Sequence, residues 1–147
     1  MAILVADLLA VLVTRCSGAL TAVGLDGTAA SPVLTEAAAT AARDSGLRPL
    51  SPYTLTDADL ADGERLASQL ADVGELRALE SVLNQLMKPD QRISLGERRW
   101  GTLRGEIERT VARREAYVED RYGIGRGTVV GGVVGLRINE PLWPEYL

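Results

Sequence analysis

Hydrophobic residues recur at helical spacing in four separate stretches of the chain, and each stretch predicts a helix. The first covers residues 2–15 and is apolar on nearly every face, which is typical of a helix that is covered on more than one side. The second opens at Ser31 and Pro32, a favourable helix start, and ends at Gly46. Between these two helices we expect residues 17–30 to form a loop or a short irregular strand pair.

The third stretch predicts the longest helix in the chain. It opens with a capping signal at Thr56, its leucines recur as far as Met87, and Pro89 stops the pattern. At about 1.5 Å per residue such a helix is roughly 45 Å long. Gly63 and Gly74 are the positions where we expect a bend or a close approach to a neighbouring helix.

The fourth stretch follows a connection at residues 88–93. Ser94 and Glu97 have the spacing of a capping box, and Gly123 closes the helix. The apolar stripe of this helix consists of Trp100, Leu103, Ile107, Val111, Val118 and Tyr122. Because only about six residues join the third and fourth helices, we expect the two to run antiparallel.

Residues 124–147 differ in character from the rest. Two β-branched runs flank Gly131 and Gly132, a pattern that predicts a β-hairpin, and residues 140–147 read as an extended arm. The predicted fold class is therefore mainly α, a helical bundle around a long antiparallel helical hairpin, with a short C-terminal β-hairpin and an extended arm. Residues 1–123 would be the helical domain, and residues 124–147 the Gly-rich hairpin and C-terminal arm.

The composition removes the commonest catalytic groups. The chain has no histidine, so it lacks the usual general base, the usual activator of a serine nucleophile and the usual zinc ligand. Its single cysteine, Cys16, forms no internal disulfide, and we expect it to be buried and inert. We therefore expect no enzymatic activity, no catalytic residues, no cofactor and no metal site.

The apolar start of the chain resembles a targeting segment only superficially. No basic residue precedes the run, Asp7 interrupts it, and the run is too short to span a bilayer. We expect it to form a helix covered by the protein or by a partner, with no role at a membrane.

Two clusters, one of acidic residues and one of glycines, could suggest a binding site, but a structural role explains each of them better. The acidic group at residues 57–64 lacks the spacing of a calcium loop and lies at a helix start, where acidic residues are expected. The glycines at residues 123–135 are followed neither by the lysine of a phosphate loop nor by a helix, which favours a hairpin.

The fourth predicted helix interleaves basic and acidic residues. A basic helix can contact a phosphate backbone, but interleaved charges favour ion pairs with solvent or with a neighbouring subunit, and the net charge of −4 does not favour nucleic acid. We expect the subunit-interface charges to be Arg104, Glu108, Arg109, Arg113, Arg114 and Glu115.

The C-terminal segment carries large apolar side chains in a stretch too short to build its own core. Tryptophan and tyrosine are favoured anchors at interfaces. Either the segment folds back over its own helices, or it docks on a neighbouring copy or another protein, which we favour. The expected partner-docking residues are Leu142, Trp143, Tyr146 and Leu147.

Residues 55–123, with leucine-rich runs after Leu55 and Glu75, the segment Ile93 to Arg99, and Arg121-Tyr-Gly123, resemble a known class of protein. They are similar to head–tail connector or adaptor proteins of long-tailed bacteriophages. These proteins pair two long helices and end in an extended arm. The first fifty residues do not match this class.

The resemblance implies a non-enzymatic virion structural protein that forms a ring, commonly twelvefold, and joins the phage head at the portal to the tail. Its partners would be neighbouring copies, portal and tail proteins, with DNA at most passing through the ring lumen. It would be assembled in the host cytoplasm and located in the virion. The alternative is a cytosolic helical protein-binding module or regulator, and a third possibility, a nucleic-acid binder, relies only on the arginines.

Overall fold

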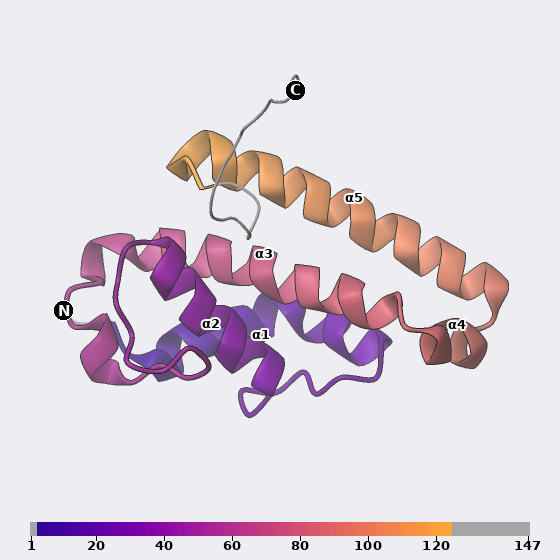
Figure 1. Cartoon of the computed structure of the whole chain (residues 1–147), viewed down its shortest axis with the longest axis horizontal. Helices are drawn as coiled ribbons and strands as arrows, with labels where there is room; N and C mark the ends of the chain where they lie inside the picture. The colour runs from indigo at the N-terminus through magenta and orange to yellow at the C-terminus, as the bar shows by residue number, and fades with distance from the viewer. Residues whose placement is uncertain (1–2, 125–147) are drawn as a thin grey trace, which may run out of the picture.

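The computed structural model describes residues 3–124, which form five α-helices and two short 3₁₀ helices (Figure 1). The α-helices are α1 (Val5–Ala22), α2 (Pro32–Asp44), α3 (Ala67–Leu86), α4 (Pro89–Leu95) and α5 (Glu97–Tyr122), and the 3₁₀ helices η1 (Asp57–Leu60) and η2 (Glu64–Leu66) precede α3. The predicted mainly helical class is confirmed. The predicted β-hairpin and arm lie outside the described residues.

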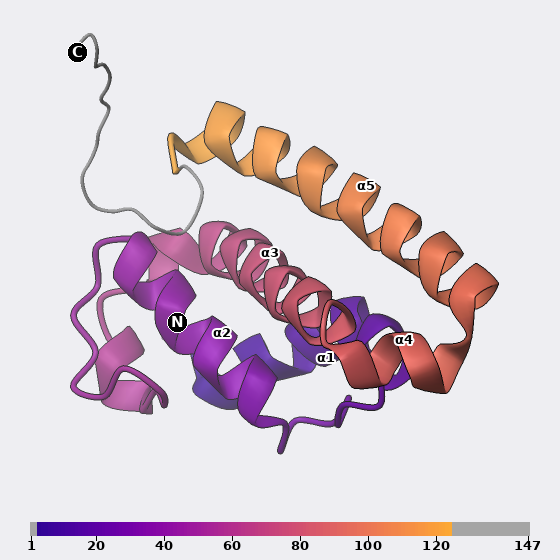
Figure 2. The ribbon, with the colours of Figure 1, turned by 45° about the vertical axis from the view of Figure 1, so that its right-hand side comes forward.

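Helix α3 is the centre of the fold, with α1 and α2 on one side and α5 on the other (Figures 1 and 2). Every residue from 70 to 79 is buried, because neighbouring helices cover α3 on more than one side. Helix α5 runs back along α3 in the opposite direction. At one end of the pair, Trp100 Nε1 donates a hydrogen bond to the carbonyl of Leu86 at 2.8 Å. At the other end, the Tyr122 hydroxyl donates to Asp72 Oδ2 at 2.6 Å.

Helix α1 extends further than the sequence pattern suggested. It ends at Ala22, so the prediction of a loop or strand pair throughout residues 17–30 is wrong for its first six residues. The cause is a buried stripe that returns every four residues and continues past the expected end: Leu8, Leu12, Cys16 and Leu20. Gly18 is tolerated inside the helix because it lies at an exposed position with open space around it.

By length and composition alone, α1 is also long enough and apolar enough to cross a membrane, with a mean hydropathy of 1.5 over 18 residues. This corrects the expectation that the run is too short. Core helices of soluble proteins and signal sequences share the same property. Of the 18 residues of α1, 22% are fully buried inside the fold, and Val5, Leu9, Val13 and Ala19 are partly buried against the core.

Helix α2 begins and ends close to its predicted limits. Ser31 occupies the N-cap position, but its buried hydroxyl makes no hydrogen bond within the described residues. Five small side chains of α2 are buried and allow it to pack closely on α3: Ala37, Ala38, Ala39, Ala41 and Ala42.

The single helix predicted from Thr56 to Met87 is wrong in its first third, where the chain forms η1 and η2 before α3 begins. The capping signal itself is confirmed, since Asp59 N donates to Thr56 Oγ1 and Thr56 N donates to Asp59 Oδ2. The interruption falls at Gly63, which is buried close to Leu47: a Cβ at Gly63 would lie 3.2 Å from Leu47 Cδ1. The expected close approach of a neighbouring segment at Gly63 is thus present, and it lies before the regular helix α3 begins.

The predicted connection and the next capping box are also wrong. Residues 89–95 form the short helix α4, which starts with a proline at a position that suits it. Ser94 lies inside α4, and α5 is preceded instead by Gly96 with φ of 85°, a conformation that favours glycine. Glu97 pairs with Arg92 rather than capping the helix. The end of α5 at Gly123 is confirmed, with φ of 71°.

Gly74 sets the approach of α1 to α3, because a Cβ there would lie 3.0 Å from Leu12 Cδ2. We predict that Gly74→Val lowers the free energy of unfolding by about 1–3 kcal/mol through overpacking. Urea denaturation followed by circular dichroism measures this effect. The matched control, Gly18→Ala, adds a methyl group in open space and should raise stability by roughly 0.5–1 kcal/mol. Equal shifts in the two variants would contradict the close approach.

Candidate functional site

The six predicted interface charges all lie on α5, but the structure gives them different surroundings. Arg104 and Glu108 form the expected i,i+4 ion pair, with Nε 3.4 Å from Oε2. Arg109 and Arg113 are exposed, and Glu115 is half-buried. Arg114 reaches across to α3, where its Nε lies 3.2 Å from Glu75 Oε2. A role of these residues in contacts between subunits stays a prediction.

Two carboxylates buried on α3 form a network that joins three helices. Asp72 and Glu75 are only 8% and 6% exposed. Arg15 of α1 bridges them, with Nη1 donating to Asp72 Oδ1 at 2.9 Å and to Glu75 Oε1 at 3.1 Å. From α5, Tyr122 donates to Asp72, and Arg114 pairs with Glu75. The network therefore fixes α1 and α5 against opposite sides of the two carboxylates.

The sequence contains a signal for this network that helical periodicity alone does not show. Asp72 and Glu75 stand three residues apart inside the stretch 70–79, where nearly all other positions are apolar. Acidic residues inside such a stretch require cationic or hydrogen-bonding partners when they are buried. The partners Arg15 and Arg114 come from distant segments, which the spacing alone does not reveal.

The Cys16 thiol and the Tyr122 phenol, both influenced by the buried carboxylates, stay protonated near neutral pH. Burial, reinforced by the nearby Glu75, raises the pKa of the Cys16 thiol to about 12. Burial and the hydrogen bond to Asp72 raise the pKa of the Tyr122 phenol above its usual value. Both groups act here as structural elements of the core, as expected for Cys16.

A second ionic network, around the buried cation Arg77, ties α3 to α2. Arg77 is 6% exposed, and its Nε donates to Asp44 Oδ2 of α2 at 2.9 Å. Its Nη1 also donates to Glu80 Oε1 at 3.0 Å, one turn further along α3. Together the two networks give α3 an ionic contact with each of its three long neighbours.

A shallow polar hollow of about 340 Å³ opens beside Glu75. It is lined by Thr110, Arg113, Arg114 and Tyr117 of α5. The Thr110 hydroxyl already donates to a backbone carbonyl in its own helix, and Arg114 is paired with Glu75. Most polar groups of the hollow are therefore already paired within the subunit, and Arg113 is its exposed charge.

The acidic group at residues 57–64 has structural roles. Asp57 Oδ1 accepts a hydrogen bond from Val5 N at 2.9 Å and so caps the first turn of α1. Asp59 caps η1, and the hydrogen bond from Thr56 N lowers the pKa of its carboxyl group. Within residues 3–124 no group of three or more His, Cys, Asp or Glu side chains is placed to hold a metal ion.

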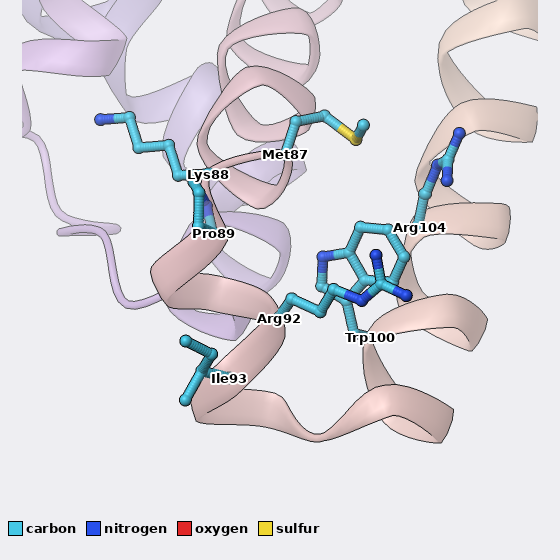
Figure 3. A pocket seen from close by; sticks show the side chains of 7 residues that line it. All are labelled: Met87, Lys88, Pro89, Arg92, Ile93, Trp100 and Arg104. Carbon is cyan, nitrogen blue, oxygen red and sulfur yellow. The ribbon is translucent and has the colours of Figure 1, made fainter.

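A mainly apolar groove of about 390 Å³ lies where α3, α4 and α5 meet (Figure 3). We call it the Trp100 groove, and its lining residues are Met87, Lys88, Pro89, Arg92, Ile93, Trp100 and Arg104. The guanidinium groups of Arg92 and Arg104 lie 4.8 Å and 5.3 Å from the centre of the Trp100 ring, within the range of cation–π contacts. Ile93 is 82% exposed at its edge.

The predicted docking residues Leu142, Trp143, Tyr146 and Leu147 lie outside the described residues. Comparison of the chain with protein-family models, with curated proteins and with solved structures found no match. The resemblance to phage connector proteins therefore depends on the sequence pattern of residues 55–123 alone.

Proposed function

We propose that the protein is a non-enzymatic structural subunit that assembles with copies of itself. The observation that carries this proposal is the outward face of α1, since only 22% of the residues of this helix, whose mean hydropathy is 1.5, are fully buried in the described part of the chain. Leu4, just before the helix, and Val11 within it are 46% and 38% exposed. Apolar surface of this kind marks an interaction site, and a second copy offers the same surface for mutual burial.

The charges of α5 support contacts between copies. Glu106, Arg109 and Arg113 are exposed at successive turns of α5, so the helix presents both signs of charge along one face. Surfaces with interleaved charges pair with complementary surfaces and set the register of an assembly more than its affinity. Helix α5 is thus suited to a lateral contact between neighbouring subunits.

In its most specific form, the proposal is a ring-forming connector that joins the phage head at the portal to the tail. The antiparallel pair α3 and α5 would act as the rigid spacer of each subunit, and residues 124–147 as the hairpin and arm that reach a neighbour. The ring would be twelvefold, located in the virion after assembly in the host cytoplasm, with DNA passing at most through its lumen. The sequence resemblance over residues 55–123 supports this form.

The test is the mass of the full-length chain in solution, measured by light scattering over a range of protein concentrations. We expect a ring-sized assembly, and co-purification with phage particles where the host carries the virus. Truncation after Asn139 should abolish assembly while circular dichroism shows nearly unchanged helical content. A loss of helical content on truncation would instead place the arm in the subunit core.

Two other outcomes would overturn the proposal in favour of its alternatives. A stable monomer that binds duplex DNA with steep salt dependence would indicate a nucleic-acid binder. A stable monomer without DNA affinity would favour the cytosolic binding module or regulator.

A further inference from the structure

We infer that, in the assembled protein, α5 of one copy packs on α3 of a neighbouring copy, in place of that copy's own α5. This inference deepens the proposed function and rests on it, because it requires that copies associate. The contact that it assigns to two copies is one that the closed subunit already displays within a single chain.

The surface of α3 that receives α5 matches that helix in both apolar and polar contacts. The buried stripe by which α5 joins the core consists of Trp100, Ile107, Val111 and Val118. Towards the end of the helix, Arg114 pairs with Glu75 of α3. One turn before Gly123, the Tyr122 hydroxyl donates to Asp72 of α3. Because a second copy has the same α3, its surface offers α5 the same set of partners.

A single residue separates the closed hairpin from one continuous helix. Helix α4, which lies at the turn between α3 and α5, ends at Leu95, and α5 begins at Glu97, so Gly96 alone lies between them (Figures 1 and 2). Helical hydrogen bonds already meet at this residue. Gly96 N donates to the carbonyl of Arg92 at 3.1 Å, and Trp100 N donates to the carbonyl of Gly96 at 2.9 Å. Rotation of Gly96 into the helical region would therefore join α4 to α5 and lift α5 off its own α3.

The conformation of Gly96 makes the closed hairpin depend on this one position. Its φ of 85° and ψ of 152° lie in a region that glycine adopts and other residues avoid. Opening at Gly96 uncovers the apolar stripe of α5, and α3 of a neighbour covers it again. Short hinges of this kind favour the exchange of an element between copies. When each copy passes its α5 to the next in one direction, the exchange closes a ring.

The first test is the variant Gly96→Ala in the full-length chain. A Cβ at Gly96 meets nothing within 4 Å, so alanine acts there only through the backbone. Alanine disfavours the φ of 85° of the closed hairpin, and it is preferred to glycine in a continuous helix. Light scattering over a dilution series gives the concentration at which half of the assembly has dissociated. We expect this concentration to fall at least about tenfold.

Two matched variants control for the methyl group and for the backbone strain. Gly101→Ala adds a methyl group in open space within α5, which is helical in both forms. Gly123→Ala places alanine at a φ of 71°, at the end of α5 away from the hinge. Both should leave the half-dissociation concentration within about twofold of the wild-type value. A change in Gly96→Ala no larger than in these two controls would overturn the inference.

The second test places the two halves of the ion pair between Glu75 and Arg114 in separate chains with their charges reversed. In a closed subunit, Glu75→Arg and Arg114→Glu each bring two like charges together. Exchange of α5 between these two variants brings opposite charges together at both sites. A chain that carries both substitutions restores the pair within one subunit and serves as the reference, with Arg15 beside position 75 as before.

We expect a mixture of the two single variants, one with a tag that changes its mass, to form assemblies that contain both chains. Its urea midpoint should lie close to that of the double variant and above those of the two single variants alone. If one single variant does not fold alone, recovery of its helical content in the mixture is the same result. A mixture that behaves as the sum of its two separate samples would contradict the exchange.

Light scattering of the wild-type chain separates this failure from failure of the proposed function. If the wild-type chain assembles and Gly96→Ala behaves as its two controls do, the proposed function stands and the exchange of α5 is wrong. If neither the wild-type chain nor Gly96→Ala assembles at any concentration, both fail.

Discussion

Replacement of Trp100 by alanine is expected to lower the free energy of unfolding by about 3–5 kcal/mol, the range for removal of a large buried aromatic side chain. Trp100 is 8% exposed and fixes the start of α5 to the end of α3. Its Nε1 donates to the carbonyl of Leu86, and the guanidinium groups of Arg92 and Arg104 lie over its ring. Alanine removes the apolar contact, both cation–π contacts and the hydrogen bond together.

Two matched variants separate these contributions in urea denaturation. Trp100→Phe keeps an aromatic ring but loses the donor to Leu86, so a loss of about 1–2 kcal/mol is expected. Tyr117→Ala removes an aromatic residue of the same helix that is 41% exposed, and should cost less than about 1 kcal/mol. A loss for Trp100→Ala no greater than that for Tyr117→Ala would mean that the start of α5 is not anchored through Trp100.

The apolar pattern correctly identified those features that depend only on the local sequence. The stripe of α5 that begins at Trp100 and the end of that helix at Gly123 were both readable, because helical periodicity and a left-handed C-cap are local properties. The errors occurred where distant contacts override local propensity. Gly63, where a bend or close approach was expected, lies between η1 and η2, but the residue that it approaches, Leu47, is sixteen positions away and is not identified by local sequence.

The same distinction holds for the candidate site. The pair Arg104 and Glu108 was predictable from its i,i+4 spacing. The partnership of Arg114 with Glu75 was not, because it depends on the way α5 returns along α3. The Trp100 groove was equally hidden, since the residues of α4 that line it were expected to form an irregular connection. Tertiary arrangement, rather than residue type, created both features.

Glu75, like Asp72, contacts both α1 and α5 from α3. Its two carboxylate oxygens are occupied by different cations, Arg15 of α1 at 3.1 Å and Arg114 of α5 at 3.2 Å. The carboxylate is 8% exposed, whereas the two arginine side chains are 36% and 38% exposed. If the carboxylate is neutralised, water can therefore hydrate the two arginine side chains. A charged side chain placed at the buried position 75 would not be hydrated in the same way.

Glu75→Lys should consequently lower the free energy of unfolding by about 3–5 kcal/mol, because it places a buried cation between two arginines. Glu75→Gln keeps the shape and one acceptor, so a loss of only about 1–2 kcal/mol is expected, and 1 M salt should reduce that loss. The charge-reversal control is Glu119→Lys at an exposed position of α5, with an expected change within about 0.5 kcal/mol. Similar urea midpoints for Glu75→Lys and Glu119→Lys would contradict the bridging role. A large difference between them would show that the Glu75 carboxylate, held between cations of α1 and α5, contributes strongly to the stability of the subunit.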